Sequence, residues 1–433
     1  MKETRLNQEL IDFLKASPTP FHAVANMIQL LGKAGFSPLL EADAWQINKG
    51  GRYYITRNDS SLIAFTLGEK NLSETGFRMA GAHTDSPCLK VKPIPEIRKE
   101  AYLQLGVEVY GGVLLSTWFD RDLSIAGRIN WIDKKGNIKK TLIDLKNPVA
   151  ILPSLAIHFD RNANDNKSIN AQTDLPPILL CHADGDMTGF GEMLISHIGT
   201  HTKAKDKPVA ISSHELCFYD TQPPAFTGLT GDFISGARLD NLLSCYIGLM
   251  GLIHADKNSS SLIVLNDHEE VGSASTTGAH GQFLMSVLER LCPGAEEFGR
   301  TMARSMMVSI DNAHGVHPNH MGKYDPNHSP LLNHGPAIKI NSNQRYASNS
   351  DTTAIFKSIC STASVPVQEF VMRSDMACGT TIGPITATKL GVTTIDIGVP
   401  TFAMHSIRET AGSKDTLYLS KAVQAYFSLK KNR

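Results

Sequence analysis

The sequence has no excess charge, no CxxC pair and no long apolar run, and each absence excludes a class of protein. Basic and acidic residues both number 42, so charge gives no reason to expect a nucleic-acid partner or an anionic membrane surface. No segment is apolar over the length that a transmembrane helix needs. The seven cysteines lie mostly within apolar runs, which is typical of reduced, buried thiols.

The amino-terminal segment is patterned like a helix of a folded domain and not like a targeting signal. Residues 1–20 carry charges throughout, and they lack the apolar core and the small-residue cleavage site of a secretory signal. Together with the reduced cysteines, this favours a cytoplasmic enzyme with no membrane partner. Small neutral molecules and peptides remain as partner classes.

The chain has 433 residues, more than a single hydrophobic core usually supports. Its pattern of predicted helices and strands changes twice. Residues 1–87 mix helical and strand patterns. Residues 88–228 show short alternating strands with glycine turns, whereas residues 229–433 return to strands that alternate with helices. We therefore expect an α/β fold in which a discontinuous domain, 1–87 plus 229–433, is interrupted by a β-rich domain of residues 88–228.

Five acidic or histidine positions stand where an apolar run ends or a helix begins. They are His83 with Asp85, Asp240, Glu269 with Glu270, Asp311, and His405. In an open α/β sheet, the carboxyl ends of neighbouring parallel strands share one crevice, so residues distant in sequence meet there. Imidazole and carboxylate ligands suit zinc, cobalt or manganese. The pattern predicts a dinuclear metal site.

The residue types also predict roles within such a site. Asp240, where a helix begins, is the candidate for a carboxylate that bridges two ions roughly 3.5–4 Å apart. Asp85 is placed to orient His83 by accepting its second ring proton. Adjacent carboxylates at a strand end point in opposite directions, so one of Glu269 and Glu270 would bind metal and the other would act as general base.

Two competing metal motifs have less support. His268 and Glu269 begin like the HExxH zinc helix, but Gly272 stands where the second histidine of that motif would be. The three histidines between residues 314 and 320 are spaced by three. Pro318 would break the helix that could align them, so we interpret this stretch as a polar loop.

Seven short strings, which occur in order over nearly the whole chain, resemble signatures of the aspartyl aminopeptidase family. They are AHTDSP at His83, SGARLDN at Asp240, DHEEVGS at Glu269, IDNAHGVHPN at Asp311, NQRYASN at Arg345, CGTTIGP at Cys378 and MHSIRE at His405. The resemblance implies a zinc-exopeptidase-like α/β/α catalytic domain whose inserted β-rich domain mediates dimerisation. It also implies a tetrahedral homo-dodecamer, built from dimers, that removes amino-terminal Asp or Glu from peptides.

The same resemblance implies a set of metal ligands and a catalytic base. The ligands implied are His83, Asp240 and Asp311 for one zinc, and Asp240, Glu270 and His405 for the other. Each subunit would then hold two Zn²⁺, for which Co²⁺ or Mn²⁺ can substitute. Glu269 corresponds to the catalytic base, and Asp85 corresponds to the acidic partner of the first histidine.

Three further residues are implied to contact the substrate. His158 resembles a histidine that reaches from the inserted domain into a neighbouring subunit's active site and stabilises the tetrahedral intermediate. This would make His158 both a catalytic and a substrate-binding residue. Lys339 matches the basic residue that pairs with an acidic substrate side chain, and Tyr346 is near it in the sequence.

Two other functions stay open on the residues alone. One is a different dinuclear metallohydrolase, such as a carboxypeptidase or an amide deacylase, because the metal positions do not say which end of a substrate binds. The other is a catalytically silent, metal-bearing assembly protein. An intact Glu269 beside Glu270 favours an enzyme, since a scaffold needs no general base.

Overall fold

Two compact units make up the chain in the computed structural model, which describes residues 3–165, 168–181, 189–201, 207–256 and 258–429. Unit 1 consists of Met1–Ser86, Pro224–Met404 and Glu409–Arg433, and unit 2 of Pro87–Pro223 and His405–Arg408. The expected inserted domain, 88–228, differs from unit 2 in three places, the first being Pro87, which belongs to unit 2. Residues 224–228 belong to unit 1, and residues 405–408 belong to unit 2.

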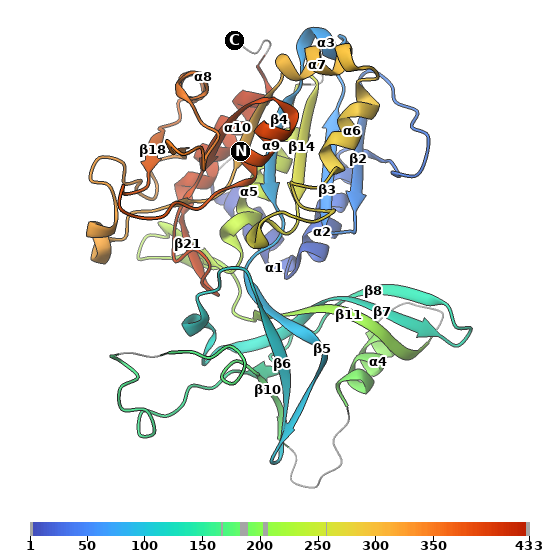
Figure 1. The fold of residues 1–433 in the computed structure, drawn as a ribbon, viewed down its shortest axis with the longest axis vertical. Coiled ribbons are helices and arrows are strands. Elements are labelled where there is room, and N and C mark those ends of the chain that lie inside the picture. The colour runs from blue at the N-terminus through green and yellow to red at the C-terminus, as the bar shows by residue number, and fades with distance from the viewer. Residues whose placement is uncertain (1–2, 166–167, 182–188, 202–206, 257, 430–433) are drawn as a thin grey trace. The chain divides into compact units, whose positions relative to one another are not determined.

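A nine-stranded sheet forms the centre of unit 1, in the order β1-β2-β3-β14-β4-β15-β19-β17-β18 (Figure 1). Its strands are β1 (Ser37–Pro38), β2 (Arg52–Arg57), β3 (Ser61–Thr66), β4 (Arg78–His83), β14 (Ser261–Asn266), β15 (Met306–Ile310), β17 (Ala337–Ile340), β18 (Gln368–Val371) and β19 (Thr393–Gly398). The central strands β14, β4, β15 and β19 run parallel. Their carboxyl ends therefore lie at one end of the sheet, as predicted for the site.

Side chains of the central strands alternate between two helical layers, because successive residues of a strand point to opposite faces. In β14, Ile263 and Leu265 pack into one core, whereas Leu262 and Val264 pack into the other. The helices of the first core are α1 (Glu3–Ala16), α2 (Pro20–Lys33), α5 (Leu239–Ile253), α8 (Ser350–Thr362) and α10 (Ser413–Phe427). Those of the second are α3 (Leu72–Thr75), α6 (Phe283–Leu291), α7 (Ala295–Ala303) and α9 (Ile382–Leu390). The expected α/β/α arrangement is confirmed.

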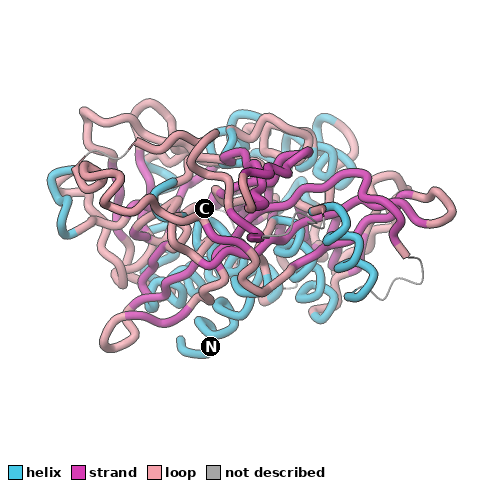
Figure 2. Tube along the Cα trace, turned by 90° about the horizontal axis from the view of Figure 1, so that it is seen from below, coloured by secondary structure: helices cyan, strands magenta, loops and turns pink. Residues whose placement is uncertain are grey.

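The described chain begins in helix α1, beside the N label in Figure 2. Leu6, Leu10 and Leu14, spaced by four, are fully buried along one side of this helix. The amino-terminal segment is therefore part of the core of unit 1, as its periodicity predicts. Among the described residues, no helix combines the length and the apolar character needed to cross a membrane.

A second, five-stranded sheet of unit 1 joins three stretches of the chain, residues 225–236, 313–314 and 400–412. Its order is β12 (Ala225–Thr227), β13 (Phe233–Gly236), β21 (Glu409–Gly412), β20 (Pro400–Phe402) and β16 (Ala313–His314). In the antiparallel pair β13–β21, Gly236 lies opposite Glu409. Glu409 is thus placed close to the start of α5, which follows β13 in the chain.

Unit 2 is β-rich, as expected. Its strands are β5 (Cys88–Lys99), β6 (Tyr102–Tyr110), β7 (Asp122–Asp133), β8 (Ile138–Asp144), β9 (Ala150–Ile151), β10 (Ile178–Cys181) and β11 (Pro208–Asp220), joined by helix α4 (Phe190–His201). The sheet order is β11-β5-β6-β10-β9-β7-β8, and β11 also pairs with β7. Its core includes Leu105, Ile125, Trp131, Phe218 and, from α4, Leu194.

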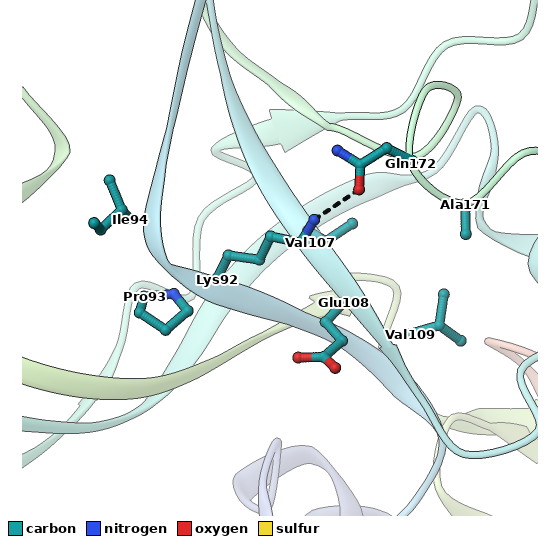
Figure 3. A pocket seen from close by; sticks show the side chains of 8 residues that line it. All are labelled: Lys92, Pro93, Ile94, Val107, Glu108, Val109, Ala171 and Gln172. Carbon is teal, nitrogen blue, oxygen red and sulfur yellow. Dashed lines mark hydrogen bonds between the residues drawn. The ribbon is translucent and has the colours of Figure 1, made fainter.

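A pocket of about 660 Å³ opens in unit 2 (Figure 3). It is lined by Lys92, Pro93, Ile94, Val107, Glu108, Val109, Ala171 and Gln172. Lys92 Nζ donates to Gln172 Oε1 at 2.9 Å across it. None of the predicted metal, base or substrate residues lines this pocket.

Candidate metal centre

Most predicted metal-site residues of unit 1 lie at or after the carboxyl ends of the parallel strands β4, β14 and β15. His83 is the last residue of β4 and pairs with Asn266, the last residue of β14. β14 leads into a 3-10 turn, η2 (Glu269–Val271), which carries both glutamates, and β15 ends at Ile310, directly before Asp311. The expectation that strand alternation points the glutamates apart is wrong, because they lie in this turn and not on the strand.

Asp240 comes from the first turn of α5, as predicted. Arg238 precedes the helix in a left-handed conformation, with φ of 62°, and Asp240 itself has a non-helical ψ of 107°. Asp240 is only 3% exposed. A carboxylate buried to this extent needs compensating partners, since loss of hydration strongly disfavours its charge.

His83 lies between two carboxylates. Its Nε2 atom is 3.5 Å from Asp240 Oδ1 and 3.6 Å from Asp311 Oδ1. Ligand atoms of His83, Asp240 and Glu270 also lie within 4.8 Å of one another. His83 and Asp240 both belong to the two groupings. An imidazole surrounded by buried carboxylates is a donor set that fits zinc.

Burial, increased by neighbouring negative charge, raises the pKa values of the two glutamates. Burial raises the pKa of Glu269 to about 8, an effect that His83 opposes and the nearby aspartates increase. Burial, followed by repulsion from Asp240, raises the pKa of Glu270 well above its usual value. Without a cation, these raised pKa values favour the protonated carboxyl groups. A divalent metal would favour the ionised carboxylates instead. This charge balance also fits a metal centre.

Lys339 pairs with a predicted metal ligand. Its Nζ atom, on a side chain that is almost fully buried, lies 3.3 Å from Asp311 Oδ2 and 5.4 Å from the ring centroid of Tyr346. Although burial raises the pKa of Asp311, Lys339 and His83 outweigh it and hold that pKa below its usual range. Burial lowers the pKa of His83, but the surrounding aspartates outweigh it and raise that pKa well above its usual value.

Asp85 contacts both the histidine and the glutamates. His83 Nδ1 lies 3.1 Å from the Asp85 carbonyl oxygen and 3.4 Å from its Oδ1, so the carbonyl is the closer acceptor for the ring proton. The Asp85 carboxylate accepts the backbone N–H groups of Glu269 and Glu270, each at 3.1 Å. Asp85 therefore fixes the turn that carries both glutamates, a role that the sequence alone does not indicate.

Other side chains brace the segments that carry the predicted ligands. Ser86 Oγ donates to the carbonyl of Asp240 at 2.6 Å, and Asn241 Nδ2 donates to the carbonyl of Ile310 at 2.8 Å. Glu409 Oε2 accepts the backbone N–H of Asp240 at 2.9 Å. These three bracing residues have no role in the sequence-based prediction. The only feature of the sequence that could have indicated them is their position, because each lies in one of the seven family-like strings that also contain a predicted ligand.

Two predicted site residues, His405 and His158, belong to unit 2. His405 Nδ1 lies 3.0 Å from the carbonyl oxygen of Gly112, and a ring that donates from Nδ1 can ligate a metal only through Nε2. His158 lies in an exposed segment, next to Phe159, which is 81% exposed. The role of His405 as a ligand and that of His158 at a second subunit stay predictions.

The histidines between residues 314 and 320 form no such centre. His317 and His320 lie with ring centroids 4.8 Å apart at the turn η3 (Pro318–Lys323), and His314 packs against Phe370. Within the part of the chain that the structure describes, the grouping of donors that could hold an ion contains none of them. The stretch is only partly the predicted polar loop, because His314 lies on strand β16 and His320 lies in η3.

An α/β/α unit with a buried imidazole among carboxylates at the ends of its parallel strands is an arrangement that fits a metal-dependent hydrolase. The model of a family described as aminopeptidase I zinc metalloprotease (M18) matches residues 13–427. The chain belongs to this family, which confirms the resemblance found in the sequence. It is therefore a zinc metallo-aminopeptidase, an enzyme that hydrolyses peptide bonds.

Relatives resemble the chain over almost its full length. It is 54% identical over 424 residues to a probable M18 family aminopeptidase 2 of Pseudomonas savastanoi pv. phaseolicola, with 98% of both chains covered. The solved structure of Chaetomium thermophilum mApe1 is similar at a TM-score of 0.87 and 33% identity, covering 99% of this chain and 98% of that one. The mApe1 dodecamer of S. cerevisiae is similar at a TM-score of 0.85 and 30% identity, covering 98% and 96%.

Proposed function

We propose that this aminopeptidase removes amino-terminal aspartate or glutamate from peptides at a dinuclear zinc site. The proposed ligands are His83, Asp240, Glu270, Asp311 and His405. The position of Asp240 carries the dinuclear part of the proposal, since its carboxylate is close both to the His83–Asp311 side and to Glu270. The acidic preference rests on Lys339 and on the resemblance.

Glu269 is the general base in this proposal. Zinc, when bound, supplies Lewis acidity and makes water nucleophilic near neutral pH. The Glu269 carboxylate takes a proton from the attacking water and passes a proton to the leaving amine. Its pKa of about 8 applies without metal, and the positive charge of bound cations would lower it, so that the carboxylate is ionised at neutral pH.

The structure supports different roles for the two glutamates. Glu270 offers an oxygen to the donor group with His83 and Asp240, whereas Glu269 is outside that group. Asp85 accepts the backbone N–H groups of both glutamates and so fixes the turn. In the proposal, Glu270 then binds metal and Glu269 faces the substrate. A scaffold protein would have no use for this second carboxylate.

Lys339 is the proposed partner of the acidic substrate side chain. Its Nζ atom lies beside the Asp311 carboxylate and over the ring of Tyr346. A buried positive charge would attract a carboxylate side chain and disfavour an apolar one. Because Lys339 also pairs with Asp311, we infer that substrate recognition and ligand orientation share this residue.

His158 is proposed to act in the active site of a second subunit. It lies among exposed apolar side chains, with Leu155 64%, Ile157 46% and Phe159 81% exposed, which a partner subunit would cover. The dodecameric S. cerevisiae relative supports a homo-oligomer. We further propose that the protein forms a tetrahedral dodecamer, built from dimers that associate through the β-rich domain, and that it acts in the cytoplasm.

The test is the turnover of chromogenic amides of Asp, Glu, Leu and Lys, before and after chelation and after restoration with zinc or manganese. Metal-dependent cleavage confined to Asp and Glu is the expected result. Cleavage of the Leu amide at a similar rate would remove the acidic pocket and keep the metals. Equal cleavage of amino-acetylated substrates would favour a deacylase, and no cleavage at all would favour a silent assembly protein.

A further inference from the structure

Both backbone polar atoms of Asp240 bind side chains from other segments. Its N–H donates to Glu409 Oε2 at 2.9 Å, and its carbonyl accepts from Ser86 Oγ at 2.6 Å. The first N–H groups of a helix have no acceptor within that helix, and the ψ of 107° takes the Asp240 carbonyl out of the helical pattern. Glu409 and Ser86 therefore supply the hydrogen bonds that α5 does not.

Burial of the Glu409 carboxylate is unfavourable in its surroundings. Glu409 is 2% exposed and lies on β21, opposite Gly236, beside a site already rich in carboxylates. Burying another acidic side chain there is unfavourable unless strong hydrogen bonds or cations compensate. The hydrogen bond from the Asp240 N–H is such a compensation, and a nearby metal would be another.

We propose that Glu409 is a positioning residue for the aminopeptidase reaction, because its carboxylate fixes the backbone that aims the Asp240 carboxylate. The inference rests on the proposed function, in which Asp240 is the ligand shared by two ions. Asp240 Oδ1 is 3.5 Å from His83 Nε2, and its donor group with Glu270 fits within 4.8 Å. In so tight a group, a displacement of about 1 Å is enough to lose about 100-fold in rate.

A purely structural role for Glu409 makes a different prediction. If Glu409 served only to hold β21 in its sheet, its loss would lower stability and leave the metal site of the folded protein unchanged. If it aims Asp240, its loss would change metal affinity and metal geometry in protein that is still folded. The two roles are therefore separated by measurements on the metal.

The experiment compares Glu409→Leu with Glu409→Gln in the full-length protein, with cobalt as the probe. Leucine removes the acceptor, whereas glutamine keeps an acceptor oxygen at the same reach. We expect Glu409→Leu to weaken Co²⁺ binding by about 10- to 100-fold in competition with a chelator, and to alter the visible spectrum of the Co²⁺ protein. kcat for an aspartyl amide should fall more than KM changes, and Glu409→Gln should recover most of each effect.

Thr410→Val is the matched control on the same strand. It removes a hydroxyl that lies 3.0 Å from Ser235 Oγ and that does not contact Asp240, so cobalt affinity and spectrum should stay as in the wild type. Wild-type cobalt affinity and spectrum in Glu409→Leu would overturn the proposal. If that variant does not fold, Glu409→Asp, which withdraws the carboxylate by one methylene, is judged by the same two readouts. Failure of the proposed function would instead be seen in the wild type, as fewer than two Co²⁺ per subunit.

Discussion

The carboxylate of Asp85 accepts the backbone N–H groups of Glu269 and Glu270, one on each oxygen, both at 3.1 Å. This residue thereby joins the loop after β4 to the turn after β14. Its carbonyl oxygen also faces the ring of His83. Asp85 holds the glutamates by their backbone, and under the proposed function their carboxylates serve metal and substrate. Asp85 is thus a positioning residue for both.

Asp85→Asn should therefore impair catalysis as well as folding. The amide keeps one acceptor oxygen and turns the other into a donor, which leaves one buried N–H without a partner. We expect the free energy of unfolding to fall by about 1–3 kcal/mol. We also expect kcat to fall by about 100-fold, because the turn that aims the glutamates is loosened. Denaturant unfolding and steady-state kinetics measure the two effects.

Asp133→Asn is the matched control for that variant. Asp133, in unit 2, accepts two backbone N–H groups on Oδ1, from Lys135 at 2.8 Å and from Asn137 at 2.9 Å, and the side-chain amide of Asn137 on Oδ2 at 3.0 Å, so an amide here also leaves a donor without its acceptor. It should lose stability of the same order and keep the wild-type kcat. An equal loss of kcat in both variants would show that Asp85 acts through stability alone.

Glu269→Gln should distinguish a general-base role of Glu269 from a metal-ligand role. Glutamine keeps the size of the side chain and cannot take a proton from water, so kcat should fall by about 10²- to 10⁴-fold. Bound zinc, measured by atomic absorption, and oligomer size, measured by light scattering, should stay unchanged. Turnover close to that of the wild type would remove Glu269 as the base, and loss of one zinc would make it a ligand.

Lys339→Met should change both specificity and the pH dependence of metal binding. Without the ammonium, the preference for Asp and Glu amides over Leu amide should largely disappear from kcat/KM. The pKa of Asp311 should rise, because Lys339 is the main charge that lowers it, so protons should compete with zinc at higher pH. Zinc titrations at several pH values should show affinity lost sooner on acidification than in the wild type.

Lys357→Met provides the control, since Lys357 pairs with Glu369 at 2.6 Å on a partly exposed surface. This change should leave specificity and zinc affinity as they are. An unchanged preference for acidic amides in Lys339→Met would assign substrate recognition to other residues.

The sequence predicts the strand ends well because burial on both faces leaves a clear pattern. Every residue of β4, β14 and β15 is buried, so each strand is largely apolar and ends at, or shortly before, a predicted site residue. The bracing contacts leave no such pattern. Ser86 and Asp240 are 154 residues apart, and Glu409 and Asp240 are 169 apart, so only the fold brings them together. The turn η2 was missed because its conformation depends on Asp85.

Asp415, in α10, makes the stability of unit 1 depend on pH away from the metal centre. Its carboxylate accepts the N–H groups of Asn333 at 2.6 Å and Gly335 at 2.8 Å. Burial nevertheless raises its pKa from 3.8 to about 7. The folded state therefore keeps a proton that the unfolded chain loses above about pH 4. This contribution to the free energy of unfolding is complete below about pH 4 and is lost as the pH rises through about 7.

Asp415→Asn should remove this dependence, because an amide does not titrate. Denaturant unfolding of the metal-free proteins between pH 5 and pH 8 should show a steeper loss of stability in the wild type than in the variant, by a few kcal/mol at most. The site carboxylates titrate in both proteins, so their effect cancels in the difference. Asp351→Asn, at an exposed position in the first turn of α8, should run parallel to the wild type. A parallel curve for Asp415→Asn as well would mean that Asp415 is ionised in the folded protein, with its two N–H donors outweighing its burial.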